Sequence, residues 1–166
     1  KQKGAKYALI HNISHIEICK AAGIDIIGGA GLNVFNSETV SLFEKERFFA
    51  ITLSPELNAP QMRDIVFDGS KKAVVQKSRL PLMVLESCIV KACGKCRKDS
   101  APDSDCALLR DRIDALFPIR GQKRFDTEFP CRNIIYNSVI SDLRMKKELY
   151  SSGIDVLCIS AEDDGM

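Results

Sequence analysis

Short apolar runs alternate with helix-like segments along the first half of the chain, and this rhythm restricts the fold more than any other feature. Strand-like apolar runs occur at 7–10, 24–27, 48–53, 73–76 and 82–85. Segments with helical spacing of apolar residues lie at 13–22, 38–45 and 59–66. Apolar strands that alternate with helices are typical of parallel βα units whose helices cover the sheet. We therefore predict an α/β fold.

The short spacing of these units suits a (β/α) barrel at least as well as an open sheet. The pattern is expected to resume with a strand at 133–136, a helix at 139–150 and a strand at 154–159. Only three or four units are visible at first, whereas a complete barrel has eight. We predict a partial TIM-type barrel, its C-terminal half. Such a half leaves open sheet edges, so an N-terminal barrel half is expected in the intact protein.

Signals at the segment ends refine this picture. Gly23 is expected to close the first helix, and Ser37 to cap the helix at 38–45. Gly28-Gly29-Ala30-Gly31 precedes an expected strand at 32–35 and lacks both a Walker lysine and the dinucleotide fingerprint. We therefore predict close passage of the backbone there and no phosphate site. His11 and His15 lack an HExxH-type glutamate and are expected to serve in packing or capping.

A polar, cysteine-rich stretch at 87–131 interrupts the βα pattern. Within it, 107–112 and 115–120 resemble two strands joined as a hairpin. We predict one domain over residues 1–166, with 87–131 as an inserted cysteine-rich β-hairpin segment. The composition, 45% hydrophobic and 28% charged, is that of a globular protein. The net charge of +2 does not by itself indicate nucleic-acid binding, and no apolar run approaches the length of a membrane span.

The chain has seven cysteines, and five of them lie between Cys88 and Cys131. Such density indicates a disulfide framework or a bound metal. The odd count and the lack of a secretory signal favour a reduced, cytoplasmic setting and a metal. Thiolates suit zinc or an iron–sulfur cluster. The favoured ligands are Cys88, Cys96, Cys106 and Cys131, with Cys93 as a substitute, and Cys19 and Cys158 are expected in the core.

Several polar residues lie at or near the ends of predicted strands. In a barrel, the C-terminal rim carries the active site, so these side chains are candidates to face a substrate. They are Asn33, Asn36, Glu56, Glu86 and Asn137. An anionic substrate would find basic partners in Arg79, Arg110 and Arg112. Polar residues at strand ends are also ordinary turn formers, and basic side chains are common on exposed strands, so these alternatives stay open.

An ordered series of motifs resembles the collagenase-like peptidases, peptidase family U-thirty-two. The first motifs are Asn12-Ile13-Ser14-His15-Ile16, Gly31-Leu32-Asn33-Val34-Phe35-Asn36-Ser37 and Thr52-Leu53-Ser54-Pro55-Glu56-Leu57. The later ones are Leu80-Pro81-Leu82-Met83-Val84-Leu85-Glu86-Ser87-Cys88, Leu109-Arg110-Asp111-Arg112, Phe117-Pro118 and Cys131-Arg132-Asn133-Ile134-Ile135-Tyr136-Asn137-Ser138. The series spans nearly the whole chain. Related sequences usually read Glu-Asn-Cys where this chain has Glu86-Ser87-Cys88.

The resemblance implies a barrel whose later strands carry a four-cysteine site. Relatives hold a [4Fe-4S] cluster there and take part in oxygen-independent hydroxylation of RNA or of a small aromatic precursor. Carried over by position, the ligands are Cys88, Cys96, Cys106 and Cys131, with Cys106 the least secure assignment. Glu56, Glu86 and Asn137 are the rim residues predicted to be catalytic.

Three functions follow as hypotheses. The first is a cluster-dependent hydroxylase in which the cluster handles electrons and the barrel orients the substrate. The second is a collagenase-like protease acting on peptides, although the chain offers no convincing triad or zinc-hydrolase motif. The third is a zinc-stabilised RNA-binding module without catalytic activity.

Overall fold

The computed structural model describes residues 4–94, 106–123, 131–142 and 153–159. For Val90, Cys106, Gln122, Lys123, Cys131 and Asp142 it describes the backbone alone. The chain divides into two compact units. The first unit comprises 1–77 and 142–159, and the second comprises 78–141 and 160–166. The predicted insertion at 87–131 lies wholly within the second unit.

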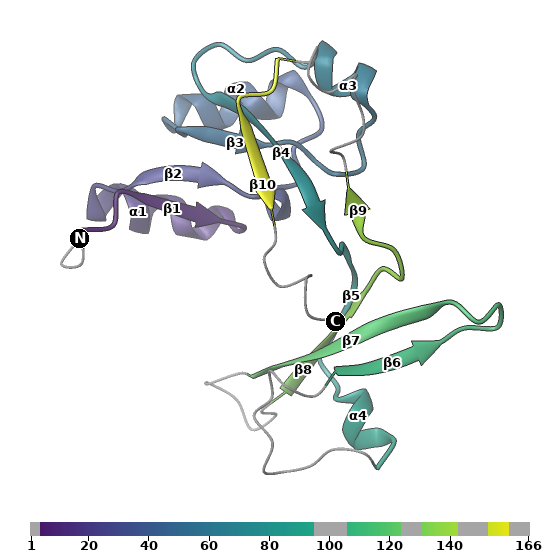
Figure 1. The fold of residues 1–166 in the computed structure, drawn as a ribbon. Coiled ribbons are helices and arrows are strands. Elements are labelled where there is room, and N and C mark those ends of the chain that lie inside the picture. Colours follow the sequence, from purple (N-terminus) through teal and green to yellow (C-terminus); the bar gives the residue numbers. More distant parts are fainter. Residues whose placement is uncertain (1–3, 95–105, 124–130, 143–152, 160–166) are drawn as a thin grey trace. The chain divides into compact units, whose positions relative to one another are not determined.

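The first unit contains a curled parallel sheet (Figure 1). Its strands, in spatial order, are β1 (Tyr7–Ile10), β2 (Asp25–Gly28), β3 (Ala50–Thr52), β4 (Lys71–Ser78) and β10 (Val156–Ile159). All neighbours along this order pair in parallel. A two-residue strand, β9 (Ser141–Asp142), also pairs with β4. The predicted α/β class is therefore confirmed.

Three helices connect these strands, and their ends follow from local chemistry. They are α1 (Ile16–Ala22), preceded by the 3-10 helix η1 (Ile13–His15), then α2 (Ser37–Lys45) and α3 (Ala59–Asp64). Gly23 ends α1 in the left-handed conformation at φ 62°, as predicted. Asn58 and Gln61 form a reciprocal capping box at the start of α3.

The core of the first unit lies between the helices and one face of the sheet. Its strand residues include Ile10, Ile26, Ile51 and Val74, and its helix residues include Cys19, Val40, Phe43 and Met62. Because all three helices contribute to one cluster, they cover the same face of the sheet. Each fully buried aliphatic side chain contributes about 1.5–3 kcal/mol to folding. Burial of Cys19 agrees with its predicted place in the core.

Lys72 joins β4 to the C-terminal end of α3. Its Nζ is buried and donates to the carbonyl oxygens of Met62 and Ile65, both at 2.9 Å. A lysine at this position satisfies backbone acceptors that the helix leaves unpaired. Desolvation lowers the pKa of Lys72, against an opposing effect of Asp155 and Asp64.

Glu44 of α2 organises the loop that leads into β4. Its Oε1 accepts hydrogen bonds from the Asp68 N–H at 2.9 Å, the Ser70 N–H at 3.0 Å and the Ser70 hydroxyl at 2.9 Å. Burial acts to raise the pKa of Glu44, but the hydrogen bonds outweigh it and lower the pKa below the ordinary range. The ionised carboxylate is therefore the form that stabilises this loop.

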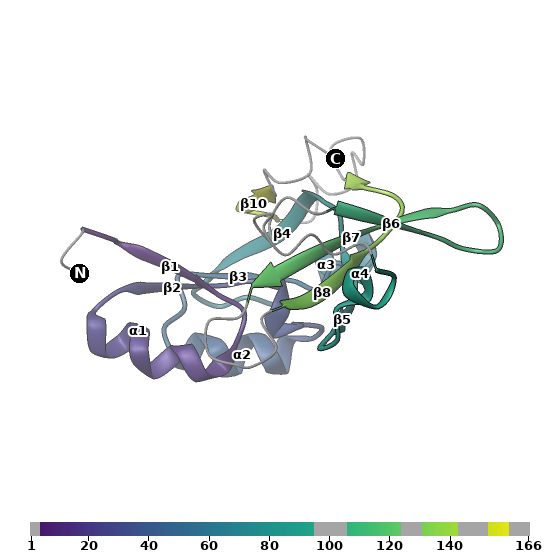
Figure 2. The ribbon, with the colours of Figure 1, turned by 90° about the horizontal axis from the view of Figure 1, so that it is seen from below.

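The second unit contains an antiparallel sheet with the spatial order β5-β8-β7-β6 (Figure 2). Its strands are β5 (Pro81–Leu85), β6 (Cys106–Arg110), β7 (Leu116–Lys123) and β8 (Cys131–Tyr136). A short helix, α4 (Ile89–Ala92), follows β5. The predicted hairpin is confirmed as β6 and β7, joined by a turn in which Asp111 Oδ1 accepts from the N–H groups of Ile113 and Ala115.

Four local predictions are wrong. The expected strand at 32–35 is a 3-10 helix, η2 (Ala30–Leu32), followed by an isolated bridge between Val34 and Leu53. Asn36, not Ser37, caps α2, because its Oδ1 reaches the Thr39 N–H at 2.8 Å. The strand expected at 133–136 does not resume a βα pattern, since it pairs only in the antiparallel sheet. The helix expected at 139–150 is contradicted at 141–142 by β9, and 143–152 lie outside the described residues.

Across the described ranges, no helix is both long and apolar enough to cross a membrane.

Candidate functional site

Two of the predicted ligand positions meet at one end of the antiparallel sheet. Leu85, the last residue of β5, pairs with Asn133 of β8. Cys88 follows three residues after Leu85, and Cys131 opens β8 two residues before Asn133. Neighbouring strands lie about 4.8 Å apart, so the two cysteines belong to adjacent chain segments. We call this end of the sheet, with Cys88, α4 and Cys131, the cysteine end.

Cys88 is the N-terminal cap of α4. Its Sγ accepts a hydrogen bond from the Lys91 N–H at 3.4 Å, and its side chain is half-buried. Cys93 caps the other end of the helix and is exposed. The four residues of α4 lie between them, so the two cysteines are five positions, or about 7.5 Å, apart along the axis. Both described thiols at the cysteine end are free, so neither forms a disulfide with another described side chain.

Asn133 links β8 to the start of α4. Its side chain is 1% exposed. Its Oδ1 accepts from the Ile89 N–H at 2.7 Å, and its Nδ2 donates to the Arg132 carbonyl oxygen at 3.2 Å. Asn133 lies within one of the family-like motifs, but no role was predicted for it from the sequence. The available signal was a single amide directly before the apolar run Ile134-Ile135-Tyr136.

Cys106 lies farther from the cysteine end. It pairs with Arg120 of β7, whereas Cys131 pairs with Lys123, three residues along the same strand. Three residues and two strand spacings put the α-carbons of Cys106 and Cys131 about 14 Å apart. Two Zn–S bonds of about 2.3 Å keep sulfurs bound to one zinc ion within about 4.6 Å. Even with both side chains extended toward each other, a separation of about 14 Å exceeds this span, so the backbone counts against Cys106 as a ligand beside Cys131.

Cys96 lies outside the described residues, and Cys106 and Cys131 are described as backbone only. Among the side chains that are described, no group of three or more His, Cys, Asp or Glu is arranged to hold a metal ion. Cys158, expected in the core, is half-buried in β10, with its Sγ 3.8 Å from the Thr52 hydroxyl.

Glu86 and Asn137 occupy opposite ends of the antiparallel sheet. Glu86 follows β5 at the cysteine end, where its Oε1 accepts from Arg132 Nη2 at 2.9 Å. Asn137 follows β8 beyond the pair Pro81–Tyr136, about 17 Å away along the strands. Its turn is held by Arg79 Nη1, which donates to the carbonyl oxygens of Asn137 and Ser138. These two predicted catalytic residues are not brought together, and the barrel-rim argument does not apply to either.

The remaining predicted rim residues belong to the parallel sheet. Glu56 is exposed in the loop after β3, and its N–H donates to Ser54 Oγ at 3.4 Å. Asn33 adopts a left-handed conformation at φ 52° at the end of η2, and Asn36 is used as a helix cap. Of the basic candidates in the hairpin, Arg110 pairs with Asp114 at 3.3 Å on the surface.

His11 packs against the glycine-rich segment after β2. Its Nδ1 accepts from the Gly31 N–H at 3.1 Å, so the proton of the neutral ring lies on Nε2. A Cβ added to Gly29 would lie 2.4 Å from His11 Cε1, and one added to Gly31 would lie 2.7 Å from His11 Cβ. The predicted close backbone passage is confirmed, as is a packing role for His11.

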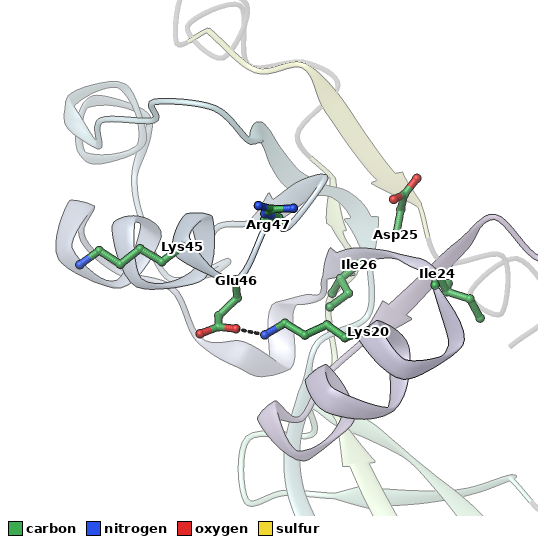
Figure 3. A pocket seen from close by; sticks show the side chains of 8 residues that line it. Lys20, Ile24, Asp25, Ile26, Lys45, Glu46 and Arg47 are labelled. Carbon is green, nitrogen blue, oxygen red and sulfur yellow. Dashed lines mark hydrogen bonds and ion pairs between the residues drawn. The ribbon is translucent and has the colours of Figure 1, made fainter.

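A surface hollow of about 470 Å³ lies near the amino end of β2, where α1 and α2 end (Figure 3). Lys20 of α1 and Glu46 after α2 form an ion pair across it. Its lining mixes cationic Lys20, Lys45 and Arg47 with anionic Asp25 and Glu46. The mixed charge selects neither an anion nor a cation. The amino ends of parallel strands are the side that serves stability in barrels.

No protein-family model, no curated protein and no solved structure matches the chain. The resemblance to the collagenase-like peptidases therefore rests on the sequence motifs alone.

Proposed function

We propose that this chain carries a metal–thiolate centre of an enzyme related to the collagenase-like peptidases, with a [4Fe-4S] cluster at the cysteine end. The observation that supports this best is the register of β5 and β8, which places Cys88 and Cys131 on adjacent segments. The proposed cluster ligands are Cys88, Cys96 and Cys131, with Cys106 or its substitute Cys93 as the fourth, and the separation of Cys106 from Cys131 counts against Cys106. The proposed reaction is oxygen-independent hydroxylation of RNA or of a small aromatic precursor in the cytoplasm.

The surroundings of Cys88 support the proposal of such a group. Four thiolates complete the ligand set of a cubane, and the Cys88 thiol is half-buried and free. The Lys91 N–H donates to Cys88 Sγ, and hydrogen bonds to ligand sulfurs are one of the features that set a cluster's potential. When bound, a [4Fe-4S] cluster supplies electron transfer. Glu86, held by Arg132, places a carboxylate at the same end, where it is available to bind substrate or hold a proton.

We further propose that the parallel sheet is part of a TIM-type barrel completed by an N-terminal half. The sequential strand order and the helices on one face support this arrangement. The two edge strands also expose apolar side chains, with Leu9 of β1 at 57% and Ile159 of β10 at 62%. Closure of the sheet into a barrel would pair the open backbone edges and enclose the face from which these side chains project. Glu56 and Asn33 would then lie at the rim that carries the active site.

The test is anaerobic purification of the full-length protein followed by metal and sulfide analysis. A brown protein with iron and sulfide near four each per chain is expected, as a cubane requires. Cys88→Ser and Cys131→Ser are expected to abolish the cluster. Cys158→Ser is the matched control, because Cys158 is also half-buried but lies in the parallel sheet, and it should retain full iron content. A colourless, iron-free anaerobic protein would overturn the proposal.

Zinc is the competing occupant, because the same thiolates suit it. Stoichiometric zinc without iron, together with salt-dependent RNA affinity, would favour the zinc-stabilised RNA-binding module. The protease alternative requires cleavage of denatured collagen that is lost on replacement of a single residue, such as Glu56 or Glu86.

A further inference from the structure

Asn133 is a buried amide in β8, directly before the apolar run Ile134-Ile135-Tyr136. Its side chain is 1% exposed, and Ile135, two residues along β8, is also buried. Burial of an amide costs free energy unless its polar atoms are hydrogen-bonded. The hydrogen bonds that Asn133 makes therefore indicate why an amide occupies this position.

The two hydrogen bonds fix the orientation of the amide. A backbone N–H only donates, so the atom 2.7 Å from the Ile89 nitrogen is the acceptor Oδ1. The Nδ2 then faces the Arg132 carbonyl oxygen at 3.2 Å. One side of the amide thus contacts the residue after Cys88, and the other contacts the residue after Cys131.

Beyond Leu85 the pairing between β5 and β8 stops. Two described interactions continue past that point. The first is the ion pair between Glu86 and Arg132, which is exposed on the Glu86 side and of a kind that contributes little. The second is the partly buried hydrogen bond from the Ile89 N–H to Asn133 Oδ1. Removal of this acceptor leaves the Ile89 N–H unpaired and costs more than loss of the surface ion pair.

We propose that Asn133 is a positioning residue that holds the Cys88 segment against β8, so that Cys88 and Cys131 are presented together to a metal. This inference deepens the proposed function and rests on it for the identity of the bound group. The positioning itself is a property of the metal-free chain, and the hydrogen bonds described for the Asn133 side chain go to backbone groups of Ile89 and Arg132.

The test measures how readily Cys88 and Cys131 join in the metal-free, reduced full chain. Diamide oxidation is followed in time, and the Cys88–Cys131 disulfide-linked peptide is quantified by mass spectrometry, in a Cys93→Ser, Cys96→Ser background. Asn133→Leu keeps a similar volume and removes the acceptor. The rate of this disulfide is expected to fall roughly five- to tenfold, as loss of one hydrogen bond implies.

Ile135→Ala is the matched control. It removes packing from the same strand without touching the hydrogen bond to Ile89, so it reports any general loosening of the sheet. The disulfide rate in this variant should stay within about twofold of the parent. An equal fall in both variants, or no fall in Asn133→Leu, would overturn the positioning role.

A second readout is iron and sulfide content after anaerobic purification without the cysteine substitutions. Asn133→Leu should lose at least half of the iron, while Ile135→Ala retains it. A wild-type protein without iron, combined with a slowed disulfide in Asn133→Leu, would sink the proposed function and leave the positioning intact. A wild-type protein that contains iron, combined with an unchanged disulfide rate in Asn133→Leu, would overturn the positioning role and leave the proposed function intact.

Discussion

The parallel and antiparallel units achieve stability in different ways. The parallel sheet buries a continuous apolar cluster against three helices. The antiparallel sheet, in contrast, has few buried residues among those described, Pro118, Ile119, Asn133 and Ile135, and exposes Leu82, Met83, Val84 and Leu108. A unit with so little core commonly needs another source of stability, such as a metal. The small described core of the antiparallel unit therefore agrees with the proposal of a stabilising metal in that unit.

Metal removal is expected to produce the largest difference between the two units. If a bound metal supplies stability to the antiparallel unit, chelation should reduce the protection of amides in β7 and β8 by orders of magnitude. Amides of the parallel sheet, such as Ile51, should keep their protection. Hydrogen exchange of the full chain, before and after chelation, measures both units at once. Unchanged protection in β8 would contradict a stabilising metal.

The next largest effect is expected from truncation of the parallel core. Ile51 is fully buried, so Ile51→Ala should lower the free energy of unfolding of the first unit by about 2–5 kcal/mol. Denaturant unfolding gives this value. Leu82→Ala is the contrasting change, because Leu82 is largely exposed in β5 and should cost less than about 0.5 kcal/mol. An equal loss of unfolding free energy in Ile51→Ala and Leu82→Ala would contradict the difference in burial between the two sheets.

Glu44 should make the stability of the parallel unit depend on pH. Its pKa is lowered in the folded state, so its contribution is fully present above the unfolded value, about 4.3, and is lost as pH falls through the folded value. Glu44→Gln should cost about 1–2 kcal/mol at pH 7 and flatten the profile below pH 5. Thermal unfolding from pH 3 to 7 measures this. A parallel fall in both proteins would assign the acid sensitivity to other groups.

The smallest predicted effect concerns His11 and the glycine segment. Gly29→Ala should displace the His11 ring, break its hydrogen bond to Gly31 and cost about 1 kcal/mol. In a His11→Ala background the same change should cost close to nothing, since the clash is gone. A double-mutant cycle reports the coupling. Additive costs would mean that the ring and Gly29 do not interact.

Most of the parallel unit was predictable because its signals are local. Periodic apolar residues, Gly23 and the Ala59 helix start all act within a few residues of themselves, and β1, α1 and β4 lie close to their predicted places. The missed elements needed distant partners. The sequence at 32–35 predicts a strand, but within this segment only Val34 forms a bridge, to Leu53. The chain just before it forms the 3-10 helix η2, in which the Gly31 N–H donates to His11 Nδ1.

At the cysteine end, too, local features were predictable from the sequence and long-range placement was not. The number and spacing of the thiols, and their preference for a soft metal, are properties of the sequence alone. Their relative placement was not predictable, because it depends on the register of β8 with β5 and β7. The register brings Cys88 toward Cys131, leaves Cys106 farther away and separates Glu86 from Asn137.

By itself, the sequence determined the α/β class, the helix boundaries near Gly23, the hairpin and the metal-prone character of the thiols, since each depends on short-range chemistry. Only the tertiary structure decided that 133–136 belongs to an antiparallel sheet and that Asn133 is buried against Ile89. Those two residues lie 44 positions apart, and the hydrogen bond between them depends on the β5–β8 pairing that brings their segments together. Contacts between residues so far apart in the sequence depend on which strands pair and in which register, and a pattern of neighbouring residues does not determine that.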